Sequence, residues 1–221
     1  MPEHEEAITA EQASQCLQNP DVLRAIFKRS TSQQPICAEP GADNPFVYMD
    51  IVIGNQPKGR LVIELFRDTC PKTAENFRAL CVGGQYNSHN QPLHYKGVHF
   101  HSVVPGHYVV GGDIINNNGT GGESIYGQYF ADENYTLKHD REGRVSMLNF
   151  KNNTNNSQFI IVLRPSPSMD GQYPVFGQVV AGLDVLHKIE SAGTPDGQPK
   201  QPVVIKDCGV LPKEAADKFA H

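Results

Sequence analysis

The sequence contains no tryptophan and has few charged side chains for its length. Charged residues make up 19% of the 221 residues, too small a share for a disordered acidic chain or a charged coiled coil. With 19 basic and 24 acidic side chains, the net charge of −5 lacks the positive excess typical of nucleic-acid-binding proteins. No apolar run approaches membrane-spanning length. We therefore expect neither nucleic acid nor a membrane as a partner.

The five cysteines form no CxxC pair, and their odd number is not typical of a disulfide framework. The first residues, MPEHEEAI, are acidic where a secretory signal would be basic. We therefore expect an intracellular protein, cytoplasmic or nuclear, with reduced thiols. Turn-forming residues are abundant by contrast, since 20 glycines and 16 prolines favour many turns between short strands.

Acidic charge is concentrated in residues 1–45, which hold seven acidic and only three basic side chains. Thr9 and Gln12 have capping-box spacing, and Asn19-Pro20-Asp21 is a helix-start signal before an apolar stripe at Val22, Leu23, Ile26 and Phe27. These patterns predict a short helical N-terminal extension and a linker. Its apolar face is expected to pack on the main domain or, alternatively, to bind a partner.

From Phe46 onward, apolar residues recur with a period of two, which is typical of strands. Helical spacing returns after Pro71 and over Leu183–Ser191. The pattern predicts a mainly β domain over 46–211, namely a closed eight-stranded antiparallel β-barrel capped by two α-helices. Residues 212–221 are predicted to form a short helical tail. The expected strands are 46–53, 59–66, 98–104, 108–110, 144–148, 159–163, 175–179 and 203–206.

Three local patterns were considered as catalytic or binding sites. The glycines at 111–112 and 119–122 lack the lysine and strand–loop–helix context of a phosphate loop, so we interpret them as turn residues. His99, His101 and His107 are close in sequence, but a metal site is less expected than buried, hydrogen-bonded histidines. A Ser/His/Asp triad is compatible with the composition, but no G-x-S-x-G motif supports it.

Longer strings, in order along about three quarters of the chain, carry more information. Residues 46–211 resemble the cyclophilin family, which implies the barrel predicted above. The strings are GRLVIELFRDTCPKTAENFRALC (59–81), HYKGVHFHSVVPGHYVVGGD (94–113), NGTGGESIYGQYFADENYTLKH (118–139), TNNSQFIIVL (154–163), DGQYPVFGQVVAGLDVLHKI (170–189) and KDCGVL (206–211).

The resemblance implies peptidyl-prolyl cis–trans isomerisation, with no cofactor and no covalent step. The uncatalysed barrier is about 18–20 kcal/mol because the amide C–N bond has partial double-bond character. A catalyst needs an apolar pocket for the proline ring and a donor aimed at the prolyl nitrogen. The family's donor is the arginine of F-H-R-I-I-P-G, but here the string reads F-H-S-V-V-P-G, with Ser102 at that position. A serine hydroxyl is neutral and too short to replace a guanidinium.

Other positions of the expected peptide-binding groove differ from the family pattern as well, whereas Asn149 and Gln158 match it. The family's tryptophan position holds Ser168, and the second Phe of S-Q-F-F is Ile160. The remaining groove positions in this sequence are His107, Tyr108, Val110, Leu148, Phe150, Met169 and Tyr173. The large rings suggest either a groove reshaped for a different ligand or a pocket closed by its own side chains.

These substitutions predict a cyclophilin-like protein with weak or absent isomerase activity that acts as a peptide- or protein-binding or scaffold module. The alternative is an active prolyl isomerase that assists protein folding. Cyclosporin, which family members bind in this groove, is expected to bind weakly or not at all, because the indole is missing and Phe150 crowds the site.

The loop over 83–94 is similar to that of a divergent-loop subgroup of the family. In that subgroup a disulfide between cysteines matching Cys81 and Cys208 has been proposed to respond to oxidation, and a glutamate matching Glu123 contacts the loop. The resemblance therefore implies a candidate redox pair. The alternative, which we favour for a reducing compartment, is two reduced and partly buried thiols.

Overall fold

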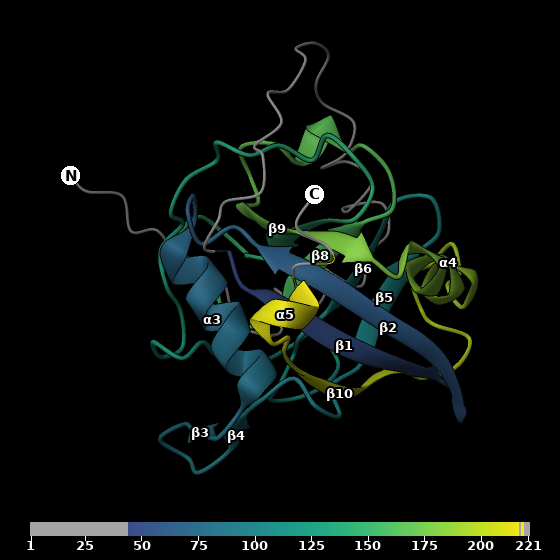
Figure 1. Cartoon of the computed structure of the whole chain (residues 1–221), viewed down its shortest axis with the longest axis horizontal. Coiled ribbons are helices and arrows are strands. Elements are labelled where there is room, and N and C mark those ends of the chain that lie inside the picture. The colour runs from purple at the N-terminus through teal and green to yellow at the C-terminus, as the bar shows by residue number, and fades with distance from the viewer. Residues whose placement is uncertain (1–43, 217, 219–221) are drawn as a thin grey trace, which may run out of the picture.

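The computed structural model describes residues 44–216 and residue 218 (Figure 1). The predicted N-terminal extension lies outside the described residues, apart from Asn44 and Pro45. The barrel strands are β1 (Phe46–Ile53), β2 (Gln56–Leu65), β5 (Phe100–Val104), β6 (Tyr108–Gly111), β7 (Arg144–Met147), β8 (Phe159–Val162), β9 (Val175–Ala181) and β10 (Val203–Val210). The helices are α3 (Pro71–Val82), α4 (Leu183–Ser191) and the short α5 (Lys213–Ala216), with a 3-10 turn at Pro167–Met169.

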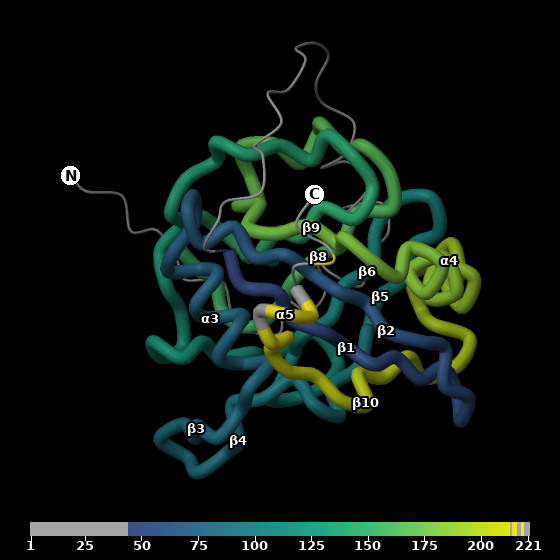
Figure 2. Tube along the Cα trace, viewed as in Figure 1, coloured from purple at the N-terminus to yellow at the C-terminus, as the bar shows by residue number. Residues whose placement is uncertain are grey.

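The eight strands form one antiparallel sheet in the order β10-β1-β2-β9-β7-β8-β6-β5. The sheet curls until its edge strands approach each other. Between them lie an isolated bridge at His99 and Val204 and a hydrogen bond from the Ile205 amide to the Val98 carbonyl (2.9 Å). The prediction of an eight-stranded antiparallel barrel with two capping helices is confirmed, although the barrel is nearly rather than fully closed. The first and last strands, β1 and β10, lie side by side (Figures 1 and 2).

The two longer helices cover the barrel because each buries one apolar stripe in it. Helix α3 begins with Pro71, a residue suited to the first helical position, and packs against β1, β9 and β10. It buries Phe77 and Leu80 in the barrel core. Helix α4 packs against β2, β5 and β6, and it buries Leu186 and Ile189.

Aromatic rings form the centre of the core. Phe77 from α3 lies 5.0–5.1 Å from the ring centroids of Tyr95, Phe159 and Phe176, in tilted or edge-to-face arrangements. Such ring pairs add stabilisation beyond the apolar area that they bury. The centre of the barrel is therefore filled by side chains and is not a ligand cavity.

Two features of the fold were not predicted. Gln85–Tyr86 (β3) and Pro92–Leu93 (β4) form a small separate hairpin within the loop over 83–94. Strand β2 begins at Gln56, three residues earlier than the apolar alternation indicated, because the β1–β2 turn is tight. Among the described residues, no helix is long and apolar enough to cross a bilayer.

Candidate functional site

The predicted groove residues lie on the outer face of strands β5 to β8 and in the segments that follow β7 and β8. Alternate residues of a strand point to opposite faces, so these strands build the barrel core with one face and the groove with the other. In β8, Phe159 and Ile161 belong to the core, whereas Ile160 and Val162 belong to a second cluster.

This second cluster, which we call the groove cluster, consists of buried side chains. None of its members is more than 8% exposed, and Met169 and Val162 are fully buried. These side chains therefore pack against one another and expose little surface to a proline ring. The groove cluster comprises Tyr108, Val110, Leu148, Ile160, Val162, Met169 and Tyr173.

Ser102, at the position of the family's arginine, lies on β5 and is partly buried. Its hydroxyl faces the backbone of Gly197, where an added Cβ would come within 3.0 Å of the Ser102 oxygen. The neighbouring Val103 amide donates to the Gly197 carbonyl at 2.8 Å. No cationic donor therefore extends from this position over the groove.

The rim of the groove carries polar and aromatic side chains. The Arg164 guanidinium lies 3.0 Å from the Nδ1 atom of the His107 ring. Phe150 and Ser168 are partly exposed, and the Phe150 amide donates to the Thr154 hydroxyl at 3.2 Å. The rim thus presents a guanidinium, an imidazole and a phenyl ring around a closed centre.

The two matching polar residues have partners within the protein. The Gln158 side chain is fully buried and donates from Nε2 to the carbonyls of Gly119 (3.1 Å) and Gly121 (2.7 Å). The Asn149 side chain is 9% exposed and donates to Asp132 and to the Gln172 carbonyl. Gln158 therefore anchors the glycine-rich loop, which agrees with the interpretation of those glycines as structural.

That loop is organised by Asp113, a fully buried carboxylate that accepts hydrogen bonds from the backbone amides of Ile115, Asn116, Asn118, Gly119 and Gly121. These bonds lower the pKa of Asp113 against the opposing effect of burial. His101 packs against Gly119, and neither of its ring nitrogens has a hydrogen-bond partner within the described part of the chain. Burial lowers the pKa of His101 to about 4, so the ring is neutral at pH 7.

The three histidines considered at the start do not form a metal site. Among the residues described, no three His, Cys, Asp or Glu side chains lie where they could hold a metal ion. A bulge between Phe100 and Ser102 also interrupts the regular alternation of β5 next to His101. His107 is instead paired with Arg164.

A Ser/His/Asp arrangement does occur, at residues that the sequence did not single out. The His139 ring contacts the Ser146 hydroxyl with Nε2 (3.0 Å) and the Asp170 carboxylate with Nδ1 (2.9 Å). Ser146 and His139 are both 0% exposed, so no substrate reaches the hydroxyl. Because Asp170 also accepts the His139 amide, this network fixes the segment next to Met169. We interpret it as a support of the groove wall.

The two cysteines of the candidate redox pair are adjacent. Cys81 ends the buried stripe of α3, Cys208 lies on β10, and Cys208 is near enough to contribute to the raised pKa of Cys81. Both thiols are free, and burial raises the pKa of Cys81. The His94 Nε2 atom lies 3.3 Å from the Cys81 carbonyl and 3.6 Å from the Cys208 sulfur. Glu123 accepts a hydrogen bond at 2.7 Å from Asn87, which lies in the loop over 83–94.

A nearly closed antiparallel barrel with two capping helices is the architecture that the cyclophilin-like strings implied. The comparison with known families agrees, since residues 48–210 match the model for cyclophilin type peptidyl-prolyl cis-trans isomerase/CLD. The chain belongs to this family.

Proposed function

We propose that this chain is a cyclophilin-family protein with a degenerate isomerase site, weak or inactive in prolyl isomerisation, and that it acts as a peptide- or protein-binding module. The observation that carries this proposal is the burial of the groove cluster, whose members are at most 8% exposed. A proline ring can enter only if these side chains rearrange, and such packed clusters resist rearrangement.

The missing donor supports the same proposal. Twisting the prolyl amide localises a lone pair on the nitrogen, and a preorganised donor there lowers the barrier. Ser102 cannot supply that donor, because its short side chain faces Gly197. Removing one preorganised donor from other enzymes lowers kcat by about 10²–10³-fold.

The rim is the surface that we assign to binding. Phe150 offers apolar contact, and the Arg164 guanidinium beside His107 offers donors for a peptide carbonyl or carboxylate. A bound segment would therefore lie across the rim without inserting a proline ring.

A protease-coupled assay with a succinyl-Ala-Ala-Pro-Phe anilide tests the catalytic part. We expect a kcat/KM at least about 100-fold below that of an active cyclophilin measured in parallel. Ser102→Arg is expected not to restore activity, because the groove cluster remains closed. Ser88→Arg, in an exposed loop, is the matched control for an added arginine. A wild-type rate close to that of the active enzyme would contradict the proposal and favour the active isomerase.

An NMR titration with proline-containing and proline-free peptides tests the binding part. We expect saturable shifts at Phe150, His107 and Arg164, similar for both peptides and reduced in Phe150→Ala. Cyclosporin is expected to cause weak shifts or none. If no peptide shifts the rim signals, or only the proline-containing peptide shifts the groove cluster, the rim is not the binding surface.

We further propose that Cys81 and Cys208 form a disulfide under oxidation, because His94 Nε2 lies against both residues and Cys208 is near enough to raise the pKa of Cys81. Cys208 would be oxidised by hydrogen peroxide to a sulfenic acid with release of water. Attack by the Cys81 thiol would then form the disulfide and release a second water.

Counting free thiols in denaturant after mild peroxide treatment tests this second proposal. The parent should lose the Cys81 and Cys208 thiols together, and reductant should restore both. Cys81→Ser should show no such paired loss, whereas Cys70→Ser, which removes another buried thiol, should behave as the parent. An unchanged thiol count in the parent would show that the pair stays reduced.

A further inference from the structure

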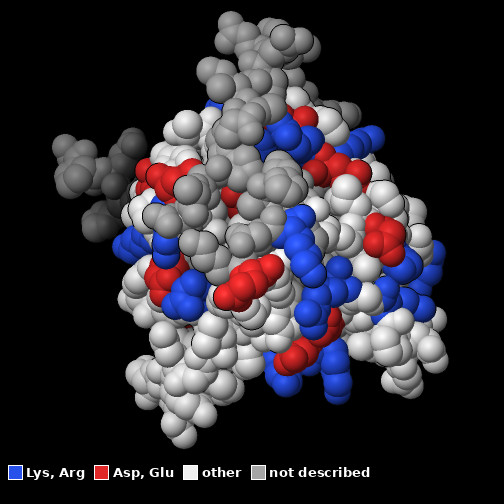
Figure 3. Space-filling view, viewed as in Figure 1, with Lys and Arg blue, Asp and Glu red and all other residues white. Residues whose placement is uncertain are grey.

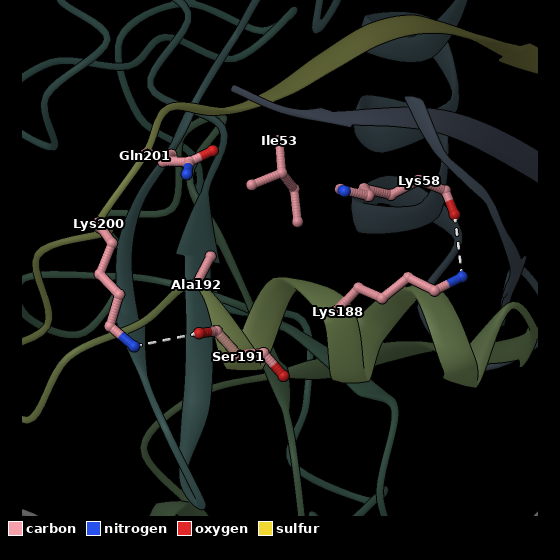
Figure 4. A pocket seen from close by; sticks show the side chains of 7 residues that line it. All are labelled: Ile53, Lys58, Lys188, Ser191, Ala192, Lys200 and Gln201. Carbon is pink, nitrogen blue, oxygen red and sulfur yellow. Dashed lines mark hydrogen bonds between the residues drawn. The ribbon is translucent and has the colours of Figure 1, made fainter. Parts of the chain in front are cut away.

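A small cavity of about 320 Å³ lies away from the groove, between the tip of the β1–β2 hairpin, the end of α4 and the residues before β10 (Figure 4). No member of the groove cluster lines it. Its apolar part is formed by Ile53 at the end of β1 and Ala192 just after α4, both largely buried.

Three lysines surround this cavity. Figure 4 shows Lys58 extending toward Ile53, and its ammonium has no acceptor among residues 44–216. The Lys188 ammonium donates to the Lys58 carbonyl at 3.2 Å and to Asp184 at 2.8 Å. The Lys200 ammonium donates to the Ser191 carbonyl at 3.3 Å. Because each ammonium has three donors, all three keep hydrogen-bonding capacity for a ligand.

The local charge balance favours an anion. The lining contains three positive side chains and no acidic one, and Asp184 at its edge is already paired with Lys188 and 73% exposed. The last carbonyls of α4 carry the negative end of the helix dipole, which would oppose an anion. The hydrogen bond from the Lys200 ammonium to the Ser191 carbonyl offsets this negative charge, because it places a cation at the C-terminal end of α4. On the face shown in Figure 3, basic side chains gather between α4 and the β1–β2 hairpin tip.

We propose that this cavity binds a phosphate monoester carried on a small apolar body. A phosphate monoester carries about −1.5 to −2 charges at pH 7, so it matches several ammonium groups better than a carboxylate does. The apolar body would lie on Ile53 and Ala192, and the Gln201 amide adds a further polar group at the rim. The volume lies at the small end of ligand pockets, which suits a single ring or a phosphorylated side chain.

The test is an NMR and calorimetric titration of the full chain with phenyl phosphate at low ionic strength. The methyl signals of Ile53 and Ala192 should shift in a saturable way. Raising salt from about 0.01 M to about 0.15 M should weaken binding, because the contacts are partly exposed. Benzoate, which has the same ring and a single charge, should bind at least about fivefold more weakly. A phosphoserine peptide, compared with phenyl phosphate, distinguishes a phosphorylated protein from a small molecule as the source of the phosphate.

Variants link the binding to the lysines. Lys58→Met should weaken phenyl phosphate binding about tenfold, since it removes one charge-assisted hydrogen bond. Lys206→Met, on the exposed side of β10, is the matched control and should change binding less than twofold. The absence of saturable shifts, equal affinity for benzoate, or equal effects of Lys58→Met and Lys206→Met would overturn the proposal.

Discussion

The inner and outer faces of strands β5 to β8 share one backbone but differ in how far they follow the family pattern. The inner face supplies Phe100, Met147 and Phe159 to the barrel core, where Phe159 meets Phe77, Tyr95 and Phe100 ring to ring. The outer face carries Ser102 and Ile160 where the family has arginine and phenylalanine. Ile160 is buried and Ser102 partly buried, but only the inner face forms the barrel core.

The two faces of these strands contribute to different parts of the protein: the inner face to the core, and the outer face to the expected groove. Residues two apart share a face, so the outer positions can change without disturbing the inner ones. The outer positions still pack, because Tyr108 and Tyr173 complete a cluster around Ile160 and Met169. Changes at the outer positions are thus compatible with an intact fold.

The largest expected effect tests the inner face. Phe159→Ala should lower the free energy of unfolding by about 3–5 kcal/mol, because it leaves a cavity beside three aromatic rings. Urea denaturation measures this change. The neighbouring outer-face variant Ile160→Val removes one methyl group and should cost only about 0.5–1.5 kcal/mol. An equal loss of unfolding free energy in both variants would contradict the difference between the two faces.

The second expected effect is a loss of folding stability at low pH caused by His101, the neighbour of Ser102 on β5. Its pKa is about 4 in the folded chain, below the ordinary histidine value of 6.5, because burial disfavours the charged ring. The unfolded chain therefore binds the proton first, and stability present above pH 6.5 is lost as the pH falls toward 4. The loss amounts to about 3 kcal/mol at most.

Denaturation of the wild type and His101→Gln at several pH values between about 7 and 4 measures this loss as a difference. His139 also has a burial-lowered pKa, but it is present in both proteins and cancels. Parallel pH profiles for the two proteins would show that His101 does not contribute.

The smallest expected effect tests whether the groove is closed. Ile160→Phe restores the family's ring, and in a filled cluster it should cost about 1–3 kcal/mol through overpacking. Thermal or urea denaturation measures the change. A neutral or stabilising result would mean that the outer face has room for a ring, and hence for a proline.

The strands and both capping helices were predictable from sequence, since alternation and helical spacing are local. β1 and α4 match the predicted ranges 46–53 and Leu183–Ser191 residue for residue. The identity of the groove positions came from the ordered strings, and the missing tryptophan falls at one of them, Ser168. The burial of the groove cluster was not predictable, because its side chains come from β6, β8 and the segments that follow β7 and β8.

Other features depend on contacts between distant segments. The bulge between Phe100 and Ser102 places Val103 in the core, three residues after Phe100, against simple alternation. The Ser146–His139–Asp170 network joins β7 to the segments before and after it, so no local motif marks it. The lysine-lined cavity combines three separate segments.

The sequence by itself determined the family and the barrel elements, because periodicity and ordered motifs are local properties of the chain, and it predicted that Ser102 stands at the family's arginine position. Only the tertiary structure decided that the groove cluster is buried, that Cys208 lies near enough to Cys81 to raise its pKa, and that three lysines line one cavity. The physical reason is that packing and electrostatics depend on distances in space, and the fold brings together residues far apart in sequence.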